Sequence, residues 1–171
     1  MIKSGHLPNK IWLFYAILFQ ISLIAATSWA SKPPETFEDI KSLLSDTTIL
    51  QNKVVYIDFW ASWCGPCQKS FPWMQRLYDQ YHNRGLEIVA VNLDKKKQSA
   101  DEFLSENVVS FPIVYDSTGT LAKKFALEAM PSSFIYGRDG HLRSANKGFK
   151  EEEAENLKYA IERLLSEEKS K

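Results

Sequence analysis

The chain has 171 residues, of which 44% are hydrophobic, 25% charged and 13% aromatic. This length and composition suit one domain with a buried core and exclude a disordered or low-complexity protein. The 21 basic and 21 acidic residues balance, so no overall field attracts nucleic acid or anionic lipid. The two cysteines, Cys64 and Cys67, are too few for a multi-disulfide scaffold or a four-cysteine zinc site.

Residues 1–30 differ in composition from the rest of the chain. They contain no acidic residue, carry Lys3 and Lys10 near the start, and continue as an almost unbroken apolar run over residues 11–26. Small residues then lead to a possible cleavage after Ala30. This layout predicts a secretory signal peptide. The alternative is an uncleaved membrane anchor, although the apolar run is shorter than the ~20 residues that span a bilayer.

A signal peptide also predicts where the protein works. Residues 31–171 hold 19 basic and 21 acidic residues, a net charge of −2, and residues 168–171 are not a retention signal for the endoplasmic reticulum. An exported compartment allows disulfides to form and persist. We therefore expect the bacterial periplasm, with the protein either soluble or anchored at its N-terminus.

After a short linker at residues 31–35, hydrophobic periodicity predicts alternating helices and strands. We expect a first helix over Thr36–Ser45, a strand over Val54–Trp60, a helix over Pro66–Arg84 that is kinked at Pro72, a strand over Glu87–Leu93, a helix over Ser99–Asn107, a strand over Phe111–Tyr115, a helix over Leu121–Leu127, a hairpin of strands Ser133–Tyr136 and Leu142–Ala145, and a last helix over Glu151–Glu168. This order predicts an α/β domain over residues 31–171, with a mixed central sheet and helices on both faces.

The two cysteines lie where the predicted buried strand passes into the first long helix. Their spacing puts both sulfurs within bonding distance when Cys67 lies one helical turn after Cys64. Pro66 suits the first turn of a helix, where a backbone N–H is not needed. A helix N-terminus favours a thiolate, so we expect Cys64 to be the nucleophile and the more shielded Cys67 to be the resolving thiol.

Three other interpretations of the cysteine pair compete with this one. Two free core cysteines would not need Gly65 and Pro66 between them at a strand–helix junction. A structural disulfide closing so small a ring would constrain little chain entropy. A zinc site would need His82 and His141, which are not at ligand spacing. A redox-active dithiol that works without metal or cofactor is therefore favoured.

Two segments carry a resemblance to a known family. The segment Ile57–Cys67, IDFWASWCGPC, resembles the active-site segment of the thioredoxin superfamily, and Met130–Phe134, MPSSF, resembles the family's cis-proline loop and following strand. The order of elements over Val54–Glu168 matches as well, which implies a thioredoxin fold. The secretion signal and the additional helix over Ser99–Asn107 are similar to the exported TlpA-like and ResA-like thiol-disulfide reductases.

This resemblance implies a role for each matching residue. Cys64 would attack a substrate disulfide and form the mixed disulfide, which Cys67 would resolve. Pro131, in a cis peptide bond, would shape the groove in which the substrate backbone pairs with Met130, and Trp63 would be an apolar wall beside the nucleophile. The substrate-binding residues expected in all are Trp63, Gly65, Pro66, Met130 and Pro131.

Asp58 interrupts the apolar strand before the cysteines. A buried, unpaired carboxylate is costly unless it takes up a proton, so Asp58 is expected to have a raised pKa. It matches the buried acid of thioredoxins and would shuttle the proton of Cys67, whereas the alternative is a structural acid satisfied by backbone donors. Two residues depart from the family pattern: Val91 replaces a thioredoxin lysine near that acid, and Lys95 replaces a glutamate of ResA-like members.

The resemblance and the Gly-Pro pair predict an exported oxidoreductase that reduces protein disulfides. Such a reductant needs a membrane thiol electron donor, and its substrates would be exported cysteine-containing proteins, with a possible role in cytochrome c maturation. A disulfide oxidase or isomerase of the same fold is the first alternative, which the reduction potential distinguishes. The second is a non-catalytic binding module, for which neither thiolate would be needed.

Overall fold

The computed structural model describes residues 32–41, 44 and 47–167. The predicted signal segment, residues 1–30, lies outside the described residues. Within the described part of the chain, no helix combines the length and the apolar character needed to cross a bilayer.

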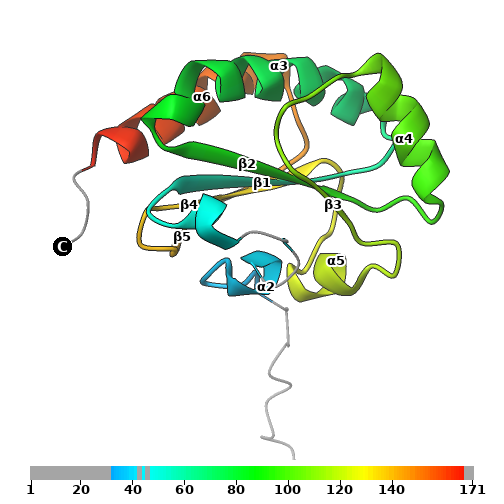
Figure 1. Ribbon diagram of the computed structural model, residues 1–171, viewed down its shortest axis with the longest axis horizontal. Helices are drawn as coiled ribbons and strands as arrows, with labels where there is room; N and C mark the ends of the chain where they lie inside the picture. The colour runs from blue at the N-terminus through cyan, green and yellow to red at the C-terminus, as the bar shows by residue number, and fades with distance from the viewer. Residues whose placement is uncertain (1–31, 42–43, 45–46, 168–171) are drawn as a thin grey trace, which may run out of the picture. The chain divides into compact units, whose positions relative to one another are not determined.

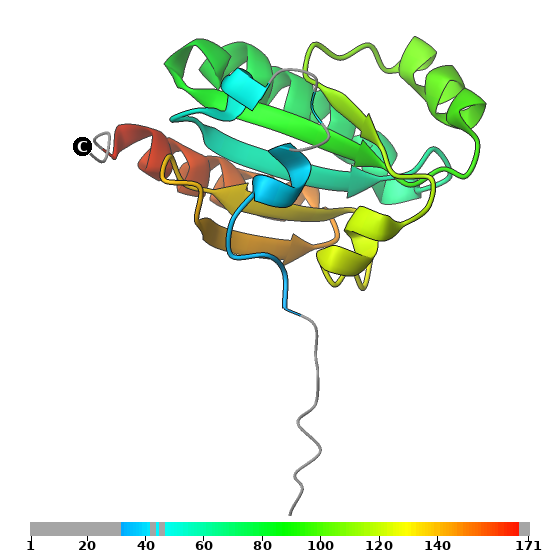
Figure 2. The same ribbon diagram turned by 60° about the horizontal axis from the view of Figure 1, so that its bottom comes forward.

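A five-stranded sheet forms the centre of the domain, in the order β3-β2-β1-β4-β5 (Figures 1 and 2). The strands are β1 (Val54–Trp60), β2 (Leu86–Asn92), β3 (Ile113–Tyr115), β4 (Ser132–Tyr136) and β5 (Leu142–Lys147). Strands β1, β2 and β3 are parallel, whereas β4 is antiparallel to both β1 and β5. The predicted mixed sheet of an α/β domain is therefore confirmed.

Helices cover both faces of this sheet (Figure 1). On one face lie α3 (Gly65–Tyr81), α4 (Lys97–Glu106) and α6 (Glu151–Ser166), and the 3₁₀ turn η2 (His82–Arg84) follows α3 directly. On the other face lie α2 (Glu38–Lys41), the 3₁₀ turn η1 (Thr47–Leu50) and α5 (Thr120–Lys124). Figure 2 brings α2 and α5 forward, in front of the strands.

Strand β1 is buried along its whole length, because it lies between two helical layers and between two neighbouring strands. Its side chains alternate between two hydrophobic clusters. Val54, Tyr56 and Trp60 join the cluster that includes residues of α3, α4 and α6, whereas Val55, Ile57 and Phe59 join the cluster that includes residues of α5. This is the reason that the sequence shows a continuous apolar run here rather than a polar–apolar alternation.

Three aromatic rings join β1, α3 and α4. The ring of Phe71 on α3 lies 4.6 Å from that of Trp60, the last residue of β1, and 4.9 Å from that of Phe103 on α4. The rings of Trp60 and Phe103 are 4.8 Å apart. These centroid distances are typical of favourable aromatic pairs, so the helix inserted between β2 and β3 is packed directly onto the end of the central strand.

The entry segment differs from the prediction. Of the helix expected over residues 36–45, the structure describes α2 over Glu38–Lys41, and residues 42, 43 and 45 lie outside the described residues. The helix starts later than expected because Thr36 forms a β-bridge with His141 and the N–H of Leu142 donates to the carbonyl of Glu35. These pairings hold the chain extended beside the hairpin, and extended backbone cannot also be helical. Tertiary pairing here overrides the local helical pattern.

Other boundaries shift by a few residues. Helix α4 begins at Lys97, two residues before the expected start, and the ammonium of Lys97 pairs with Asp101 at 2.5 Å, which supports its first turn. Helix α3 continues through Pro72, and a kink there stays a prediction.

Arg138, in the turn between β4 and β5, links three segments of the chain. Its guanidinium donates to the main-chain carbonyls of Asn52 (2.9 Å), Arg84 (3.2 Å) and Leu165 (3.2 Å). These carbonyls precede β1, end η2 and lie on α6. The guanidinium is planar and has several N–H donors, so it can bind main-chain carbonyls from three separate segments at once.

Removal of the Phe71 ring should be costly, because it would leave a cavity among the rings of the aromatic core. We expect Phe71→Ala to lower the free energy of unfolding by about 3–5 kcal/mol in urea titrations of the oxidised protein. Tyr159→Ala is the matched control, since Tyr159 on α6 is 70% exposed and its removal should change stability by about 0.5 kcal/mol or less. Equal effects of the two substitutions would contradict this packing.

Candidate active site

Cys64 lies at the N-terminus of α3, where the predicted strand–helix junction placed it. It is the N-cap residue, with an extended backbone, and Pro66 lies in the first turn of the helix. The carbonyl of Cys64 accepts hydrogen bonds from the N–H groups of Cys67 (3.0 Å) and Gln68 (3.4 Å). Unpaired amides at this end of a helix and the helix dipole both favour a thiolate over a thiol.

Cys64 and Cys67 form a disulfide, with their Cα atoms 5.2 Å apart. Cys64 is 5% exposed, and Cys67 is fully buried. An approaching sulfur can therefore reach Cys64 and not Cys67, which is the asymmetry that an attacking and a resolving cysteine require. Both cysteines belong to the hydrophobic cluster beneath α3.

Asp58 lies on the face of β1 that the cysteine cluster covers, because it alternates with Tyr56 and Trp60. It is 1% exposed, and its Oδ2 atom has no hydrogen-bond partner among the described residues. Burial raises the pKa of Asp58 well above its usual value. Burial, followed by the nearby charge of Asp58, also raises the pKa of Tyr56. The expected buried acid is thus a group that strongly prefers to be protonated.

The strand register corrects one expectation about the neighbours of Asp58. Asp58 is paired with Ala90 on β2, not with Val91, which is paired with Phe59. Val91 and Phe59 both belong to the cluster on the other face of the sheet. The β2 residue paired with Asp58 is therefore an alanine. As expected from the sequence, β2 places no lysine beside this acid.

On the other side of Asp58, the neighbouring residue is polar. Asp58 is paired with Ser133 on β4, which is 4% exposed. The side-chain amide of Asn146 on β5 donates to the hydroxyl of Ser133 at 3.5 Å. A line of polar side chains thus runs from the buried carboxylate to the edge strand of the sheet.

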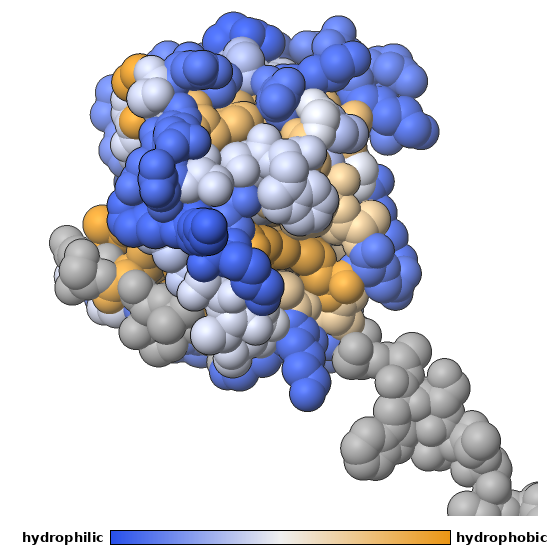
Figure 3. All heavy atoms as spheres, turned by 90° about the vertical axis from the view of Figure 1, so that its right-hand side faces the viewer, coloured by the Kyte–Doolittle hydropathy of each residue, from blue (hydrophilic) through white to orange (hydrophobic). Residues whose placement is uncertain are grey.

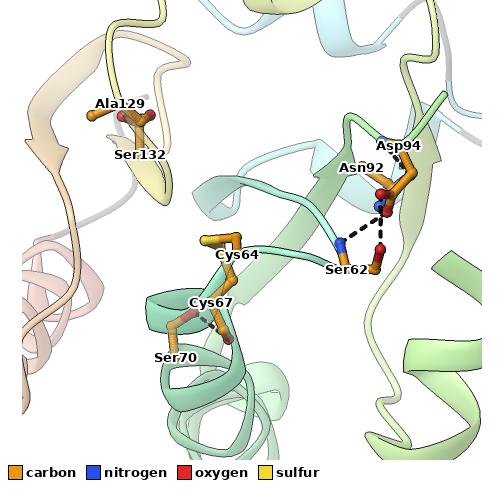
Figure 4. The surroundings of a disulfide bond; sticks show 8 residues. All are labelled: Ser62, Cys64, Cys67, Ser70, Asn92, Asp94, Ala129 and Ser132. Carbon is orange, nitrogen blue, oxygen red and sulfur yellow. Dashed lines mark hydrogen bonds between the residues drawn. A yellow bond between two sulfur atoms is a disulfide. The ribbon is translucent and has the colours of Figure 1, made fainter. Parts of the chain in front are cut away.

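The loop before β4 lies opposite Cys64, as Figure 4 shows for Ala129 and Ser132. The Met130–Pro131 peptide bond in this loop is cis, and Met130 packs against the cluster that contains both cysteines. The hydroxyl of Ser132 donates to the carbonyl of Ala129 at 2.8 Å, and the N–H of Gly148 donates to the carbonyl of Pro131 at 2.7 Å. These bonds fix the loop against the neighbouring strand.

The surface beside Cys64 is open and partly apolar. Trp63 is 69% exposed, and a Cβ atom added at Gly65 would meet no other atom within 4 Å. Figure 3 views the side of the molecule toward which β1 runs, and hydrophobic surface is visible there among hydrophilic side chains. Exposed apolar surface rimmed by polar groups is typical of a protein-binding site. The substrate-binding roles of Trp63, Gly65, Pro66, Met130 and Pro131 stay predictions.

A polar network beside the cysteines was not predicted from the sequence. The buried carboxylate of Asp94, just after β2, accepts hydrogen bonds from both the N–H and the hydroxyl of Ser62, two residues before Cys64. One signal could have revealed it: β1 and β2 are parallel neighbours, so the polar residues that follow them meet at the same edge of the sheet.

Lys95, by contrast, is exposed and donates to the carbonyl of Ser117 at 3.0 Å.

Within the described ranges, no group of three or more His, Cys, Asp or Glu side chains is arranged to hold a metal ion. The chemistry that the site itself offers is that of two sulfurs and one buried carboxyl group.

Comparison with known families identifies a match over most of the described chain. Residues 32–145 match the AhpC/TSA family. The chain is also similar to the curated protein "Thiol-disulfide oxidoreductase ResA" of Oceanobacillus iheyensis, with 32% identity over 111 residues, and to the protein of the same name from Bacillus thuringiensis subsp. konkukian, with 34% identity over 114 residues. These alignments cover 65% and 67% of this chain but 58% and 65% of the relatives. The chain thus spans less than two thirds of their length.

Two solved protein structures are also similar to this chain. StoA of Bacillus subtilis superimposes with a TM-score of 0.56 and 33% identity, covering 64% of this chain and 82% of that one. A Chlorobium tepidum structure described as a thiol:disulfide interchange protein, DsbE, superimposes with a TM-score of 0.68 and 38% identity, covering 70% of this chain and 84% of that one.

The raised pKa of Asp58 predicts a pH-dependent cost to stability. Above the unfolded pKa of about 4, the unfolded state releases the proton that the folded state retains, so the free energy of unfolding falls as pH rises. We expect Asp58→Asn to remove this slope. The variant should therefore be more stable than the original protein at pH 7. The gain should be about 1.4 kcal/mol for each pH unit above the unfolded pKa, and it stops growing once the pH exceeds the folded pKa.

Urea unfolding of both oxidised proteins between pH 4 and pH 8 measures this difference. The gain should shrink toward zero as the pH approaches 4, because Asp58 is then protonated in both states. A stability gain that does not depend on pH would contradict the assignment of the slope to Asp58.

Proposed function

The chain belongs to the AhpC/TSA family of the thioredoxin superfamily, and from this membership we propose that it is an exported thiol-disulfide oxidoreductase that reduces disulfides in other proteins. One observation carries the proposal: a disulfide at the N-terminus of α3 in which Cys64 can be reached and Cys67 is shielded. Similarity to proteins named thiol-disulfide oxidoreductase supports the same chemistry.

In the first step, the Cys64 thiolate of the reduced enzyme attacks one sulfur of a substrate disulfide. The substrate S–S bond breaks, a mixed disulfide between Cys64 and the substrate forms, and the released substrate thiolate takes up a proton from water. The helix N-terminus favours this step because it stabilises Cys64 as a thiolate before the attack.

In the second step, Cys67 attacks the sulfur of Cys64 and releases the other substrate sulfur as a thiolate. Cys67 must lose its proton to do so, and we propose that Asp58 is the acceptor in those molecules in which its carboxyl group is ionised. The released thiolate is then protonated, and the enzyme is left with the Cys64–Cys67 disulfide. Two electrons have passed from the dithiol to the substrate.

A new cycle requires two electrons from a thiol donor. We propose a membrane donor on the outer side of the bilayer and exported cysteine-containing proteins, apocytochrome c among them, as substrates. The predicted signal segment supports export to the periplasm, and the oxidising character of that compartment is the reason that a dedicated donor is needed.

The alternative is an oxidase or isomerase with the same fold, and the direction of electron flow separates the two. We expect a Cys64–Cys67 reduction potential near that of thioredoxin, about −270 mV, or below it. Equilibration of the protein in dithiothreitol and glutathione redox series measures this potential. A value near −120 mV, typical of a strong oxidant, would contradict the reductant proposal.

Single cysteine substitutions test the order of the two attacks. Cys67→Ser should accumulate a mixed disulfide through Cys64, visible on non-reducing gels, because no resolving thiol remains. Cys64→Ser should form no such adduct and should lower protein-disulfide reduction by about 10³-fold or more. Adduct formation by Cys64→Ser at the rate of Cys67→Ser would reverse the assigned roles. If the original protein reduces no disulfide, and if a variant without both cysteines still binds the same partner proteins, the binding-module alternative would be favoured.

A further inference from the structure

We propose that Asp94 is a positioning residue that presents Trp63 to protein substrates, and that it does so by fixing the turn just before Cys64. The inference rests on the proposed function, since Trp63 is taken as part of the surface on which a substrate protein docks. It adds a residue that lies just after β2, outside the segment that carries the reacting sulfurs.

Asp94 holds Ser62 with both oxygens of its carboxylate (Figure 4). Oδ2 accepts from the backbone N–H of Ser62 at 2.9 Å, and Oδ1 accepts from the Ser62 hydroxyl at 2.9 Å. Two charge-assisted bonds to one residue fix its main chain and its side chain together.

The carboxylate is itself held in place. Asp94 is 5% exposed, and its Oδ2 also accepts from the side-chain amide of Asn92 at 2.7 Å, while the side-chain oxygen of Asn92 accepts from the Asp94 N–H at 3.1 Å. The N–H of Leu93, between them, donates to the carbonyl of Trp60 at 2.9 Å. Asp94 is thus a rigid extension of β2, bonded to the end of β1.

The turn that Asp94 holds carries Trp63. The N–H of Cys64 donates to the carbonyl of Ala61 at 3.0 Å, which closes a four-residue turn with Ser62 and Trp63 at its two central positions. A turn of this kind leaves its central residues few free dihedral angles, so a fixed Ser62 sets the direction in which Trp63 leaves the backbone. Trp63 is 69% exposed, and no core packing of its own replaces that constraint.

Cys64 is positioned differently. It is the N-cap of α3, and its carbonyl is bonded to the first turn of that helix. Loss of the Asp94 bonds should therefore impair the docking of a large substrate more than the intrinsic reactivity of the Cys64 thiol. A purely structural role for Asp94 would not separate these two properties.

Asp116 provides a matched control. It is 6% exposed, follows β3, and accepts hydrogen bonds from the N–H groups of Thr120 (2.9 Å) and Ala122 (3.0 Å) at the start of α5. Asp116→Ala thus removes a buried, doubly bonded carboxylate without touching Ser62. This variant shows how a general loss of stability affects the measured reaction rates.

The experiment compares Asp94→Ala, Asp116→Ala, Ser62→Ala and Ser62→Thr in the reduced full-length protein. One measurement is kcat/KM for reduction of insulin, a protein disulfide, and the other is the rate of Cys64 alkylation by iodoacetamide, a small probe that needs no docking surface. Thermal unfolding checks that each variant is folded at the assay temperature.

We expect Asp94→Ala to lower kcat/KM for insulin by about tenfold, mainly through KM, while alkylation stays within about twofold of the original rate. Ser62→Ala should show a smaller loss of the same kind, and Ser62→Thr, which keeps the hydroxyl, should restore the original values. Asp116→Ala should leave both rates unchanged.

Other results overturn the inference in distinguishable ways. If insulin reduction by Asp94→Ala equals that of Asp116→Ala, or if insulin reduction and alkylation fall together, Asp94 does not position a docking surface and the proposed function stands. If the original protein alkylates normally but does not reduce insulin, the proposed function fails as well.

Discussion

The position of β1 in the middle of the sheet is the constraint on which the rest of the structure depends. Its neighbours are β2 and β4, and its two faces are covered by helices, so every side chain along it is buried. The chain leaves this rigid strand through one tight turn and enters α3 at Cys64. The reactive sulfur therefore lies just beyond the end of a fully buried central strand, where its position relative to the sheet is determined by backbone hydrogen bonds.

The same burial creates the chemistry of the site. A carboxyl group in the middle of β1 has no water to stabilise its charge, so Asp58 holds its proton to an unusually high pH. The fold gives up stability at neutral pH to keep this group, and its raised pKa brings its affinity for a proton closer to that of a thiol. The aromatic packing of Phe71 and Phe103 around Trp60 helps to keep water away from this region.

Much of this arrangement could be predicted from local sequence patterns. The apolar run of β1, the periodicity of α3 and the Cys-Gly-Pro-Cys spacing all depend on residues close together in the chain. The features that were missed depend on pairing between distant segments. Strand register decides that Ala90, not Val91, lies beside Asp58, and the meeting of two strand ends brings Asp94 to Ser62. Pairing with the hairpin also holds Thr36, the first residue of the first expected helix, in an extended conformation.

The three carbonyls bound by Arg138 have a consequence for how this sequence can diverge. Because the guanidinium binds main-chain oxygens, the contact itself places no demand on the identity of the side chains at positions 52, 84 and 165. Gly85 has no such freedom, since a Cβ atom there would lie 2.6 Å from the Arg138 guanidinium. In relatives that keep this arginine, the contact should therefore select for the glycine, whereas any constraint on the residues that supply the carbonyls must come from their own packing or backbone conformation.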